Sequence, residues 1–440
     1  MKATTIPPPS PKIPQKKNYR MRSRLIHGSF NTKRWDYDHH VIPPLSSSTT
    51  FRLSSVHRGL EGFVEFGSEE VALEKKVPIY IYDRLDEPTR GMLEENLPLA
   101  EEGEICVTFA TGMAAIAAAL GITTHHGHEI LAHAQLYGST YSLLTTWLPR
   151  NGVSTKFCNL MKPRCLRELA TAHTRVVYFE TPTNPTLELI DITAVRREVD
   201  HLNHGRKEKE KIFIIVDNTF ATPHCQRPLT LGADLVCHSL TKNIGGFGTD
   251  MGGAVIGPHS HYHALMAYRK DFGGVLSPKN AWPILVYGLP TLGARIANQQ
   301  KTALRVAQFL ESHPKVALVF YPGLDSFPQK ELAGRQMLSY DGKFAPGSLL
   351  YFILKDDPGS SRAADRLVDY VAENAYTITL AVSLGQLKTL IENPYSMTHF
   401  NLPPEEKEAS GIHPGGIRLS VGLEDWHDII DDLRTALDAV

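Results

Sequence analysis

Continuous apolar runs, separated by polar and glycine-containing segments, recur along the chain. The clearest run is Ile212–Val216, which is rich in β-branched residues and breaks off at Asp217-Asn218-Thr219. A run without polar alternation predicts a strand that is buried on both faces, as the strands of parallel sheets are. A second run at 234–238 leads directly into Ser239-Leu240-Thr241-Lys242. Because open α/β sheets bind ligands at the carboxyl ends of their strands, these polar groups mark a candidate site.

The rest of the pattern predicts alternating strands and helices, followed by a second, smaller set of elements. In the first part we expect strands at 104–111, 129–134 and 175–180 and an Ala-rich helix at 113–120. In the second part we expect a long helix at 296–310, strands at 349–354, 377–382 and 417–421, a helix at 363–371, and a last helix with Ile429, Ile430, Leu433, Leu437 and Val440 on one face. This alternation is typical of the α/β class, and a chain of 440 residues is long enough for two domains.

Composition narrows the class of protein. The 46 basic and 47 acidic residues give a net charge of −1, so no global field favours nucleic acid or an anionic membrane. No apolar run approaches the roughly 18 residues that a membrane-spanning helix needs. The cysteines are few, odd in number and without metal-site spacing, which indicates a reducing cytoplasm and no metal site. Each is expected to be a small buried apolar residue: Cys106, Cys158, Cys165, Cys225 and Cys237.

The first 24 residues are rich in Pro, Lys and Arg and have no apolar core, so they do not form a secretory signal. They also lack acidic residues, which leaves an organelle transit peptide as one interpretation. A disordered arm, or one draped over a partner, is the favoured interpretation.

The candidate chemistry centres on Lys242. An amine beside two hydroxyls at the exit of a buried strand can act as a Schiff-base nucleophile if burial lowers its pKa. Taken alone, Lys242 is more simply interpreted as a surface lysine that follows a strand. The carboxylate of Asp217, delivered at the end of the neighbouring predicted strand, favours the catalytic interpretation.

From Asp217 to Lys242 the chain reads D-N-T-F-x-x-P and then Q-x-P-L-x-x-G-A-D-x-V-x-H-S-x-T-K. This pattern resembles the transsulfuration (Cys/Met metabolism) family of pyridoxal-phosphate enzymes. The resemblance implies that Lys242 carries pyridoxal 5'-phosphate as a Schiff base and that Asp217 pairs with the pyridinium nitrogen. It also implies the fold-type I PLP-dependent transferase fold, with a mostly parallel seven-stranded sheet and a smaller C-terminal α/β domain. We therefore expect an N-terminal arm at 1–75, a cofactor-binding large domain at 76–295 and a small domain at 296–440.

Further motifs agree with this resemblance from residue 25 to the C-terminus. The segment Glu180-Thr-Pro-Thr-Asn184-Pro-Thr is highly specific to the family and implies that Asn184 contacts cofactor and substrate, with Glu180 in support. Tyr137 is expected to stack on the cofactor ring and to relay protons. By the same resemblance the cofactor-binding residues are Tyr82, Arg84, Gly112, Met113, Tyr137, Asn184, Asp217, Thr219, Ser239, Thr241 and Lys242. The substrate-binding residues are Asn184, Ser383 and Arg418, and the catalytic residues are Lys242, Tyr137 and Asp217.

In relatives, the counterparts of Tyr82 and Arg84 reach across a dimer interface to the cofactor phosphate of the other subunit. The resemblance thus implies a homo-oligomer with shared sites, and tetramers are usual in the family. An arginine suits this task because its rigid fork of donors matches phosphate oxygens.

The sequence departs from the family pattern at several positions. Glu87 stands where Asn is usual and follows Asp86, which indicates either a preference for a cationic substrate or, as favoured here, a solvated helix start. Gln135 replaces an Asp, and Ser139 stands where methionine γ-lyases carry a cysteine. Gln299 and Gln300 replace an Arg-His pair.

The predicted activity is γ-elimination from a methionine- or homoserine-type amino acid, giving a 2-oxo acid and ammonia. The Lys270-Asp271 pair favours this reading because methionine γ-lyases have a similar pair. The alternative is γ-replacement, as in O-acylhomoserine sulfhydrylases or cystathionine γ-synthases. A catalytically silent paralogue is disfavoured because Lys242, Asp217 and Arg418 are all present. A nicotinamide-dependent dehydrogenase is disfavoured because no G-x-G-x-x-G follows an early strand.

Overall fold

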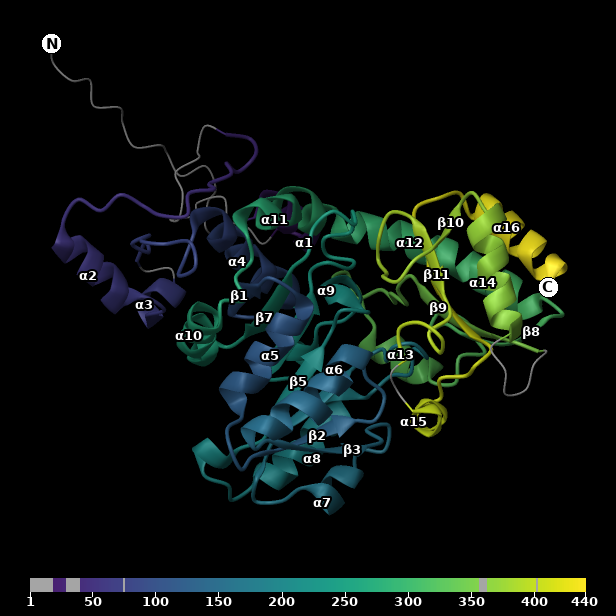
Figure 1. Cartoon of the computed structure of the whole chain (residues 1–440), viewed down its shortest axis with the longest axis horizontal. Helices are drawn as coiled ribbons and strands as arrows, with labels where there is room; N and C mark the ends of the chain where they lie inside the picture. The colour runs from purple at the N-terminus through teal and green to yellow at the C-terminus, as the bar shows by residue number, and fades with distance from the viewer. Residues whose placement is uncertain (1–18, 29–39, 74–75, 356–361, 401–402) are drawn as a thin grey trace, which may run out of the picture.

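A seven-stranded sheet forms the centre of the larger part of the molecule (Figure 1). The structure is a computed structural model that describes residues 19–28, 40–73, 76–355, 362–400 and 403–440. Only β7 (Gly253–Gly257) runs antiparallel to its neighbours, so the sheet is mostly parallel, as predicted. Across the sheet the strands lie in the order β1 (Ile105–Phe109), β7 (Gly253–Gly257), β6 (Leu235–Ser239), β5 (Phe213–Asp217), β4 (Thr174–Glu180), β2 (Glu129–His133) and β3 (Ser154–Cys158).

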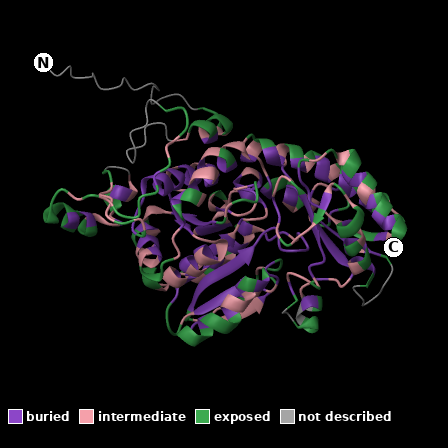
Figure 2. Ribbon diagram, turned by 45° about the horizontal axis from the view of Figure 1, so that its top comes forward, coloured by how far each residue is buried: buried purple, intermediate pink, exposed green. Residues whose placement is uncertain are grey.

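Both faces of this sheet are covered by helices, which explains why the central strands are apolar without interruption. On β5, Ile215 packs on one face with α5 (Gly112–Thr123) and α10 (Tyr262–Phe272). Its neighbours Ile214 and Val216 point to the other face, toward α8 (Ile192–Asn203). Successive side chains of a strand alternate between faces, so a strand between two helical layers must be apolar at every position. The burial colours of Figure 2 show this buried sheet inside its helices.

The C-terminal part contains a second sheet of five strands, which lies beside the first in Figure 1. Only β10 and β11 are parallel in this sheet. Its apolar side is covered by α14 (Arg362–Asn374), α16 (Trp426–Ala439) and the second half of α12 (Leu289–Ser312). The strands lie in the order β10 (Ile378–Leu380), β11 (Thr389–Glu392), β12 (Gly416–Ser420), β9 (Leu349–Leu354) and β8 (Val316–Phe320).

The helix α12 passes from the large sheet to the small one. Its first half packs with the apolar residues of α4 (Pro88–Glu101), and its second half packs in the C-terminal core. The predicted helix at 296–310 is therefore only the C-terminal two thirds of α12. The expected domain boundary at 295/296 falls inside this helix and stays a prediction.

Shorter helices complete the described fold. They include α2 (Val56–Glu65) and α3 (Glu69–Ala72). These two helices lie in a segment for which the mixed, charged sequence predicted no element. Their N-caps, Ser55 and Ser68, each accept a hydrogen bond from a first-turn amide, as N-cap serines do. The remaining α-helices are α1 (Met21–His27), α2 (Val56–Glu65), α3 (Glu69–Ala72), α6 (Gly138–Ser142), α7 (Cys165–Leu169), α9 (Thr222–Cys225), α11 (Pro278–Pro283), α13 (Lys330–Gln336) and α15 (Pro404–Ala409). The short 3-10 or π turns are η1 (Leu143–Trp147), η2 (Leu148–Asn151), η3 (Glu208–Glu210), η4 (Pro228–Leu231), η5 (His259–His261) and η6 (Ile284–Gly288).

Two expectations about individual side chains are wrong. The start of α4 is not solvated: Glu87, its N-cap, is 0% exposed and Asp86 is 5% exposed, because α1, α11 and β1 pack around this helix. Glu87 accepts a hydrogen bond from the Arg90 amide at 2.9 Å, and burial raises the pKa of its carboxyl. Four of the five cysteines are buried as expected, but Cys165 is only half-buried because it lies at the start of the outer helix α7.

Residues 1–18, 29–39 and 74–75 of the expected N-terminal arm lie outside the described residues, so the expectation of a disordered or draped first segment falls mostly outside them. Among the described helices, none combines the length and the apolar character needed to cross a bilayer.

Candidate active site

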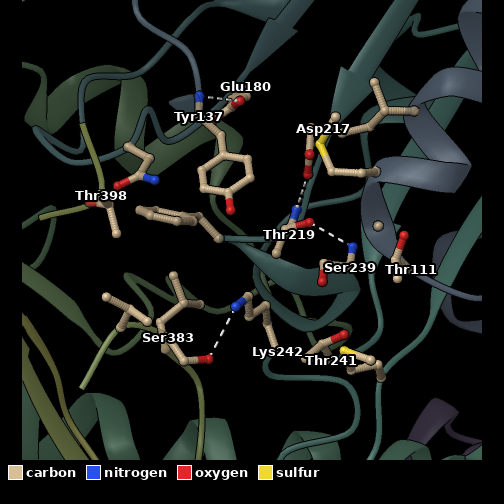
Figure 3. Close-up of a pocket in the computed structure, with 18 of the residues that line it drawn as sticks. Thr111, Tyr137, Glu180, Asp217, Thr219, Ser239, Thr241, Lys242, Ser383 and Thr398 are labelled. Carbon is tan, nitrogen blue, oxygen red and sulfur yellow. Dashed lines mark hydrogen bonds between the residues drawn. The ribbon is translucent and has the colours of Figure 1, made fainter. Parts of the chain in front are cut away.

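A cavity of about 270 Å³ opens at the carboxyl ends of β4, β5 and β6, and residues of the small sheet and its loops also line it (Figure 3). Side chains from both parts of the chain line it. They are Thr111, Gly112, Met113, Ile116, Tyr137, Glu180, Pro182, Asn184, Asp217, Thr219, Phe220, Ser239, Thr241, Lys242, Met251, Val382, Ser383, Leu384, Thr398 and Arg418. All the predicted site residues except Tyr82 and Arg84 are in this set.

Lys242 enters the cavity from the loop that follows β6. Its Nζ donates a hydrogen bond to the Ser383 hydroxyl at 3.1 Å, which joins the two parts of the chain across the cavity (Figure 3). Burial lowers the pKa of the amine, the positive charge of Arg418 lowers it further, and Glu392 opposes this. A lowered pKa increases the fraction of neutral amine, which is the nucleophilic and basic form.

A glycine makes the approach of the two parts possible. Gly385 follows Ser383 closely and has a φ of +72°, a conformation that favours glycine. A Cβ at this position would lie 2.5 Å from the backbone nitrogen of Asn243, the neighbour of Lys242. The loop that follows β10 therefore contacts the lysine loop directly.

Asp217 ends β5 beside Glu180, which ends β4 in the same register. The Thr219 amide donates to Oδ1 of Asp217 at 2.9 Å, and Oε1 of Glu180 accepts from the Tyr137 amide at 2.7 Å. Burial raises the pKa of both carboxyls, and the charge of Asp217 raises that of Glu180 further. Two neighbouring carboxyls in a site of low polarity need a cation or a proton, so this end of the cavity suits a positively charged ligand group.

The opposite character is found at the N-terminus of α5. Thr111 caps the helix by accepting from the Ala114 amide at 3.1 Å. The earlier amides of Gly112 and Met113 have no intrahelical acceptor, because the first N–H groups of any helix lack one. The hydroxyls of Ser239 and Thr241 line the same part of the cavity. Free amides, the helix dipole and hydroxyls together form an anion-binding seat.

Arg418 projects from β12 and is 3% exposed. Its Nη1 donates to Oδ1 of Asn184 at 3.1 Å, and its Nη2 donates to the carbonyl oxygen of Ser383 at 2.8 Å. The three predicted substrate-binding residues are thus joined directly. Nη2 also lies 3.0 Å from Oε1 of Glu392, a neighbour that the sequence analysis missed. Glu392 and Arg418 meet through strand pairing, for which no local sequence signal exists.

Tyr82 and Arg84 lie outside the cavity of their own chain. Tyr82 is 42% exposed, and the Arg84 guanidinium lies 5.7 Å from the centre of its ring. Nη1 of Arg84 donates to the carbonyl oxygen of Lys270 at 2.7 Å. These side chains are therefore on the surface of the protomer, together with the Lys270-Asp271 pair, whose charged atoms are 3.3 Å apart.

Two of the unusual glutamines have structural partners. Gln135 is 2% exposed, donates to the Ser410 carbonyl oxygen at 2.8 Å and accepts from the Thr186 hydroxyl at 2.9 Å. Gln299 donates to the carbonyl oxygen of Gln386 at 2.9 Å and so ties α12 to the loop that carries Ser383. Ser139 is exposed on α6 and does not line the cavity.

The residues present fit pyridoxal 5'-phosphate. The cavity offers an amine of lowered pKa, a carboxylate pair and an anion seat, and the cofactor needs a partner for its aldehyde, its ring nitrogen and its phosphate. The close approach of Gly112 to Ser239 supports the fit, because a Cβ on Gly112 would lie 2.8 Å from Cβ of Ser239 and would narrow the anion seat.

Comparison with known proteins agrees with this fit. The family model for Cys/Met metabolism PLP-dependent enzymes matches residues 23–438. An L-methionine gamma-lyase of Treponema denticola is 38% identical over 400 residues, which are 90% of this chain and 92% of the relative. A cystathionine gamma-lyase of Bacillus subtilis is 36% identical over 362 residues, which are 82% of this chain and 89% of the relative.

A solved structure agrees as well. The crystal structure of cystathionine gamma-lyase from Lactobacillus plantarum complexed with L-serine matches with a TM-score of 0.82 and 28% identity, covering 96% of this chain and 99% of that chain. The match of the family model over nearly the whole chain, with these relatives, shows that the chain belongs to the Cys/Met metabolism family of PLP-dependent enzymes.

Proposed function

We propose that this enzyme catalyses γ-elimination on a γ-substituted L-amino acid of the methionine or homoserine type. The products are a 2-oxo acid, ammonia and the leaving group. The observation that carries the proposal is that the Lys242 amine, the Asp217 carboxylate and the Arg418 guanidinium all line one cavity. The curated relatives named above are γ-lyases, which supports elimination.

In this proposal Lys242 would hold the cofactor through Nζ, and Asp217 would serve its ring nitrogen. The anion seat of Gly112, Met113, Ser239 and Thr241 would hold the phosphate, and Thr219 fixes Ser239 by accepting a hydrogen bond from the Ser239 amide at 2.8 Å. Tyr137 would stack on the ring, and the hydrogen bond from its amide to Glu180 fixes its backbone position. When bound, the cofactor supplies an electron sink that stabilises negative charge on the substrate carbons.

The substrate carboxylate is proposed to bind Arg418, with Asn184 and Ser383 holding the guanidinium in place. Nζ of Lys242 would take the α-proton of the substrate, and the lowered pKa of Lys242 suits this role because a base must be unprotonated. Asp217 would hold a proton at the ring nitrogen of the bound cofactor. The Tyr137 hydroxyl, which points into the cavity in Figure 3, gives a proton to the leaving group.

The wall of the cavity includes Phe220, Val382 and Leu384, which are apolar. Such a wall suits an uncharged γ-substituent such as a thioether better than a cationic one. The carboxylate of Glu87, which had suggested a cationic substrate, caps α4 and does not line the cavity. The Lys270-Asp271 pair, which favoured elimination in the sequence, also lies outside the cavity and does not form its wall.

The partner in this proposal is a second copy of the chain. Tyr82 and Arg84 are exposed and lie away from their own cavity, where they can reach the phosphate seat of a neighbouring protomer. A dimer with shared sites, assembled further into a tetramer as is usual in the family, would place them so.

A product assay tests the proposed reaction. Methionine, cystathionine, O-acetylhomoserine and canavanine are each supplied with and without sulfide, and 2-oxo acid is measured. Oxo acid formed without sulfide supports elimination, and the panel then identifies the leaving group that the cavity accepts. Turnover that requires sulfide or a thiol and yields no oxo acid would replace the proposal with γ-replacement.

A further inference from the structure

Arg418, which lines the cavity at the carboxylate end of the proposed substrate site, forms a buried ion pair with Glu392, which is not among the lining residues. Glu392 on β11 lies directly opposite Arg418 on β12 in the antiparallel register. Oε1 of Glu392 is 3.0 Å from Nη2 of Arg418, and the two side chains are 1% and 3% exposed. Thr398, which lines the cavity, donates to the same Oε1 at 2.9 Å. The carboxylate of Glu392 therefore lies next to the wall residues Arg418 and Thr398, and the pair is shielded from water.

Both terminal nitrogens of Arg418 have acceptors before any substrate arrives. Nη1 donates to Asn184, and Nη2 donates to the Ser383 carbonyl oxygen while it faces Glu392. A carboxylate that binds a guanidinium in the bidentate manner needs two of these N–H groups. An arriving carboxylate must therefore share the guanidinium with the carboxylate that the protein already provides. In a buried site, repulsion between the two carboxylates is only weakly screened.

The surroundings of Glu392 add to this effect. Its Oε2 is buried and accepts no hydrogen bond within the described parts of the chain. Few hydrogen-bond donors therefore offset the negative charge of the Glu392 carboxylate. The pair also reaches the lysine, because Arg418 lowers the pKa of Lys242 and Glu392 raises it. Glu392 thus acts on both positive groups that a substrate would meet.

We propose that Glu392 is a specificity-determining counter-charge, which weakens the attraction of Arg418 for the carboxylate of a ligand. The inference rests on the proposed role of Arg418 as the binding site of the substrate carboxylate. With the attraction weakened, a carboxylate alone does not hold a ligand in the cavity. Retention requires the substrate amine, which reacts at the position held by Lys242. The site thereby selects amino acids over simple carboxylic acids, and it releases a 2-oxo acid product readily.

Titration calorimetry on the holoenzyme tests this proposal without relying on turnover. The probes are desaminomethionine, which is methionine without its α-amine, and the carboxamide of the same compound. They have the same chain but differ in charge. In Glu392→Gln, which keeps the shape of the side chain, the dissociation constant of the carboxylate should fall by roughly tenfold or more. That of the amide should change by less than about twofold, because the amide carries no charge.

A matched control comes from a second buried pair. Glu94 and Arg269 form an ion pair at 4% and 0% exposure, and neither side chain lines the cavity. Glu94→Gln removes a buried carboxylate from an arginine in the same way and should leave the affinities of both probes unchanged. Glu392→Asp is a second variant that keeps the charge but draws it back from Nη2, so the carboxylate affinity should rise by a smaller factor.

The outcomes distinguish an error in the proposed substrate site from an error in the proposed role of Glu392. If Arg418→Gln leaves the carboxylate-to-amide preference at its wild-type value, then Arg418 does not bind the carboxylate, and the proposed substrate site is wrong. If Arg418→Gln abolishes the preference but both Glu392 variants bind the carboxylate no better than the wild type, the counter-charge is wrong while the substrate site stands. A carboxylate affinity that falls in both Glu392 variants would show that Glu392 only positions the guanidinium, and this too would overturn the proposal.

Discussion

Replacing Gly112 with alanine tests the anion seat by adding a single methyl group. Gly112 is the first residue of α5 and has no positive φ, so alanine is acceptable to the backbone there. The new Cβ would lie 2.8 Å from Cβ of Ser239 and 3.1 Å from its Cα. Carbon atoms normally approach to about 3.5–4.0 Å, so the start of α5 and the Ser239 backbone must separate by roughly 0.5–1 Å. Because Cα belongs to the backbone, a change of rotamer cannot relieve the contact.

The same displacement moves the amides of Gly112 and Met113 away from the hydroxyls of Ser239 and Thr241. We expect a loss of about 1–3 kcal/mol in the free energy of unfolding of the cofactor-free protein, as is usual for overpacking. Hydrogen bonds to a charged group contribute about 1.5–3 kcal/mol each, so loss of one corresponds to a cofactor affinity that is weaker by roughly 10- to 100-fold. Equilibrium titration of the apoenzyme, followed by the absorbance of the bound cofactor, measures this change.

The matched control is Gly334→Ala on α13. A Cβ at Gly334 meets no atom within 4 Å, and its φ is also not positive. Alanine in a helix interior is more stable than glycine by about 0.5–1 kcal/mol, so this variant should gain stability and keep its cofactor affinity. If Gly112→Ala binds the cofactor as tightly as the wild type, the phosphate does not occupy the N-terminus of α5, and the assignment of the anion seat is refuted.

Three further predictions concern Lys242, Asp217 and the subunit interface. Burial lowers the pKa of Lys242 below its usual 10.5. At pH values between the lowered pKa and 10.5, the amine is protonated in the unfolded cofactor-free chain but neutral in the folded one, so the unfolded chain binds more protons. The free energy of unfolding should therefore rise with pH through that range. In Lys242→Met this rise should be smaller, as measured by the urea midpoint at each pH. The same dependence of the midpoint on pH in the variant and the wild type would contradict the lowered pKa. Asp217→Asn should keep bound cofactor but slow α-proton exchange into deuterated water by roughly a hundredfold or more, as measured by NMR; unchanged exchange would remove Asp217 from the ring nitrogen. Arg84→Ala and Lys242→Ala should each be inactive, yet an equal mixture refolded together should regain about a quarter of wild-type activity, because each mixed dimer contains one intact site. An inactive mixture, with mixed dimers verified by mass spectrometry, would place Arg84 in the site of its own chain.

The polar residues that follow the buried strands were predictable from the sequence, and the segment 212–242 shows why. A strand covered on both faces must be apolar throughout, so polar residues at its end stand out against the run. Asp217 and Lys242 were found in this way, and the structure brings them into one cavity. The Ala-rich segment after Gly112 was equally clear, because a strand, a glycine and a helix start have a local sequence pattern.

Elements with weaker local patterns were missed. β8 has exposed positions at Ala317 and Leu318, and β3 begins at an exposed residue, so neither forms a continuous apolar run. β7 is apolar but short, with glycines at both ends, and only its pairing with β1 and β6 makes it a strand. α2 and α3 depend on serine caps within a charged segment, where composition alone indicated no element.

What the sequence by itself determined is the family, the fold class and most of the residues that line the candidate site. Only the tertiary structure decided which groups surround those residues. Strand pairing places Glu392 beside Arg418, and helix packing buries Glu87 in the start of α4. Tyr82 lies on the surface rather than in the cavity of its own chain. The physical reason is that apolar periodicity and helix caps arise from neighbours in the chain, whereas the register between distant strands and the burial of a charge arise from the packing of the whole molecule.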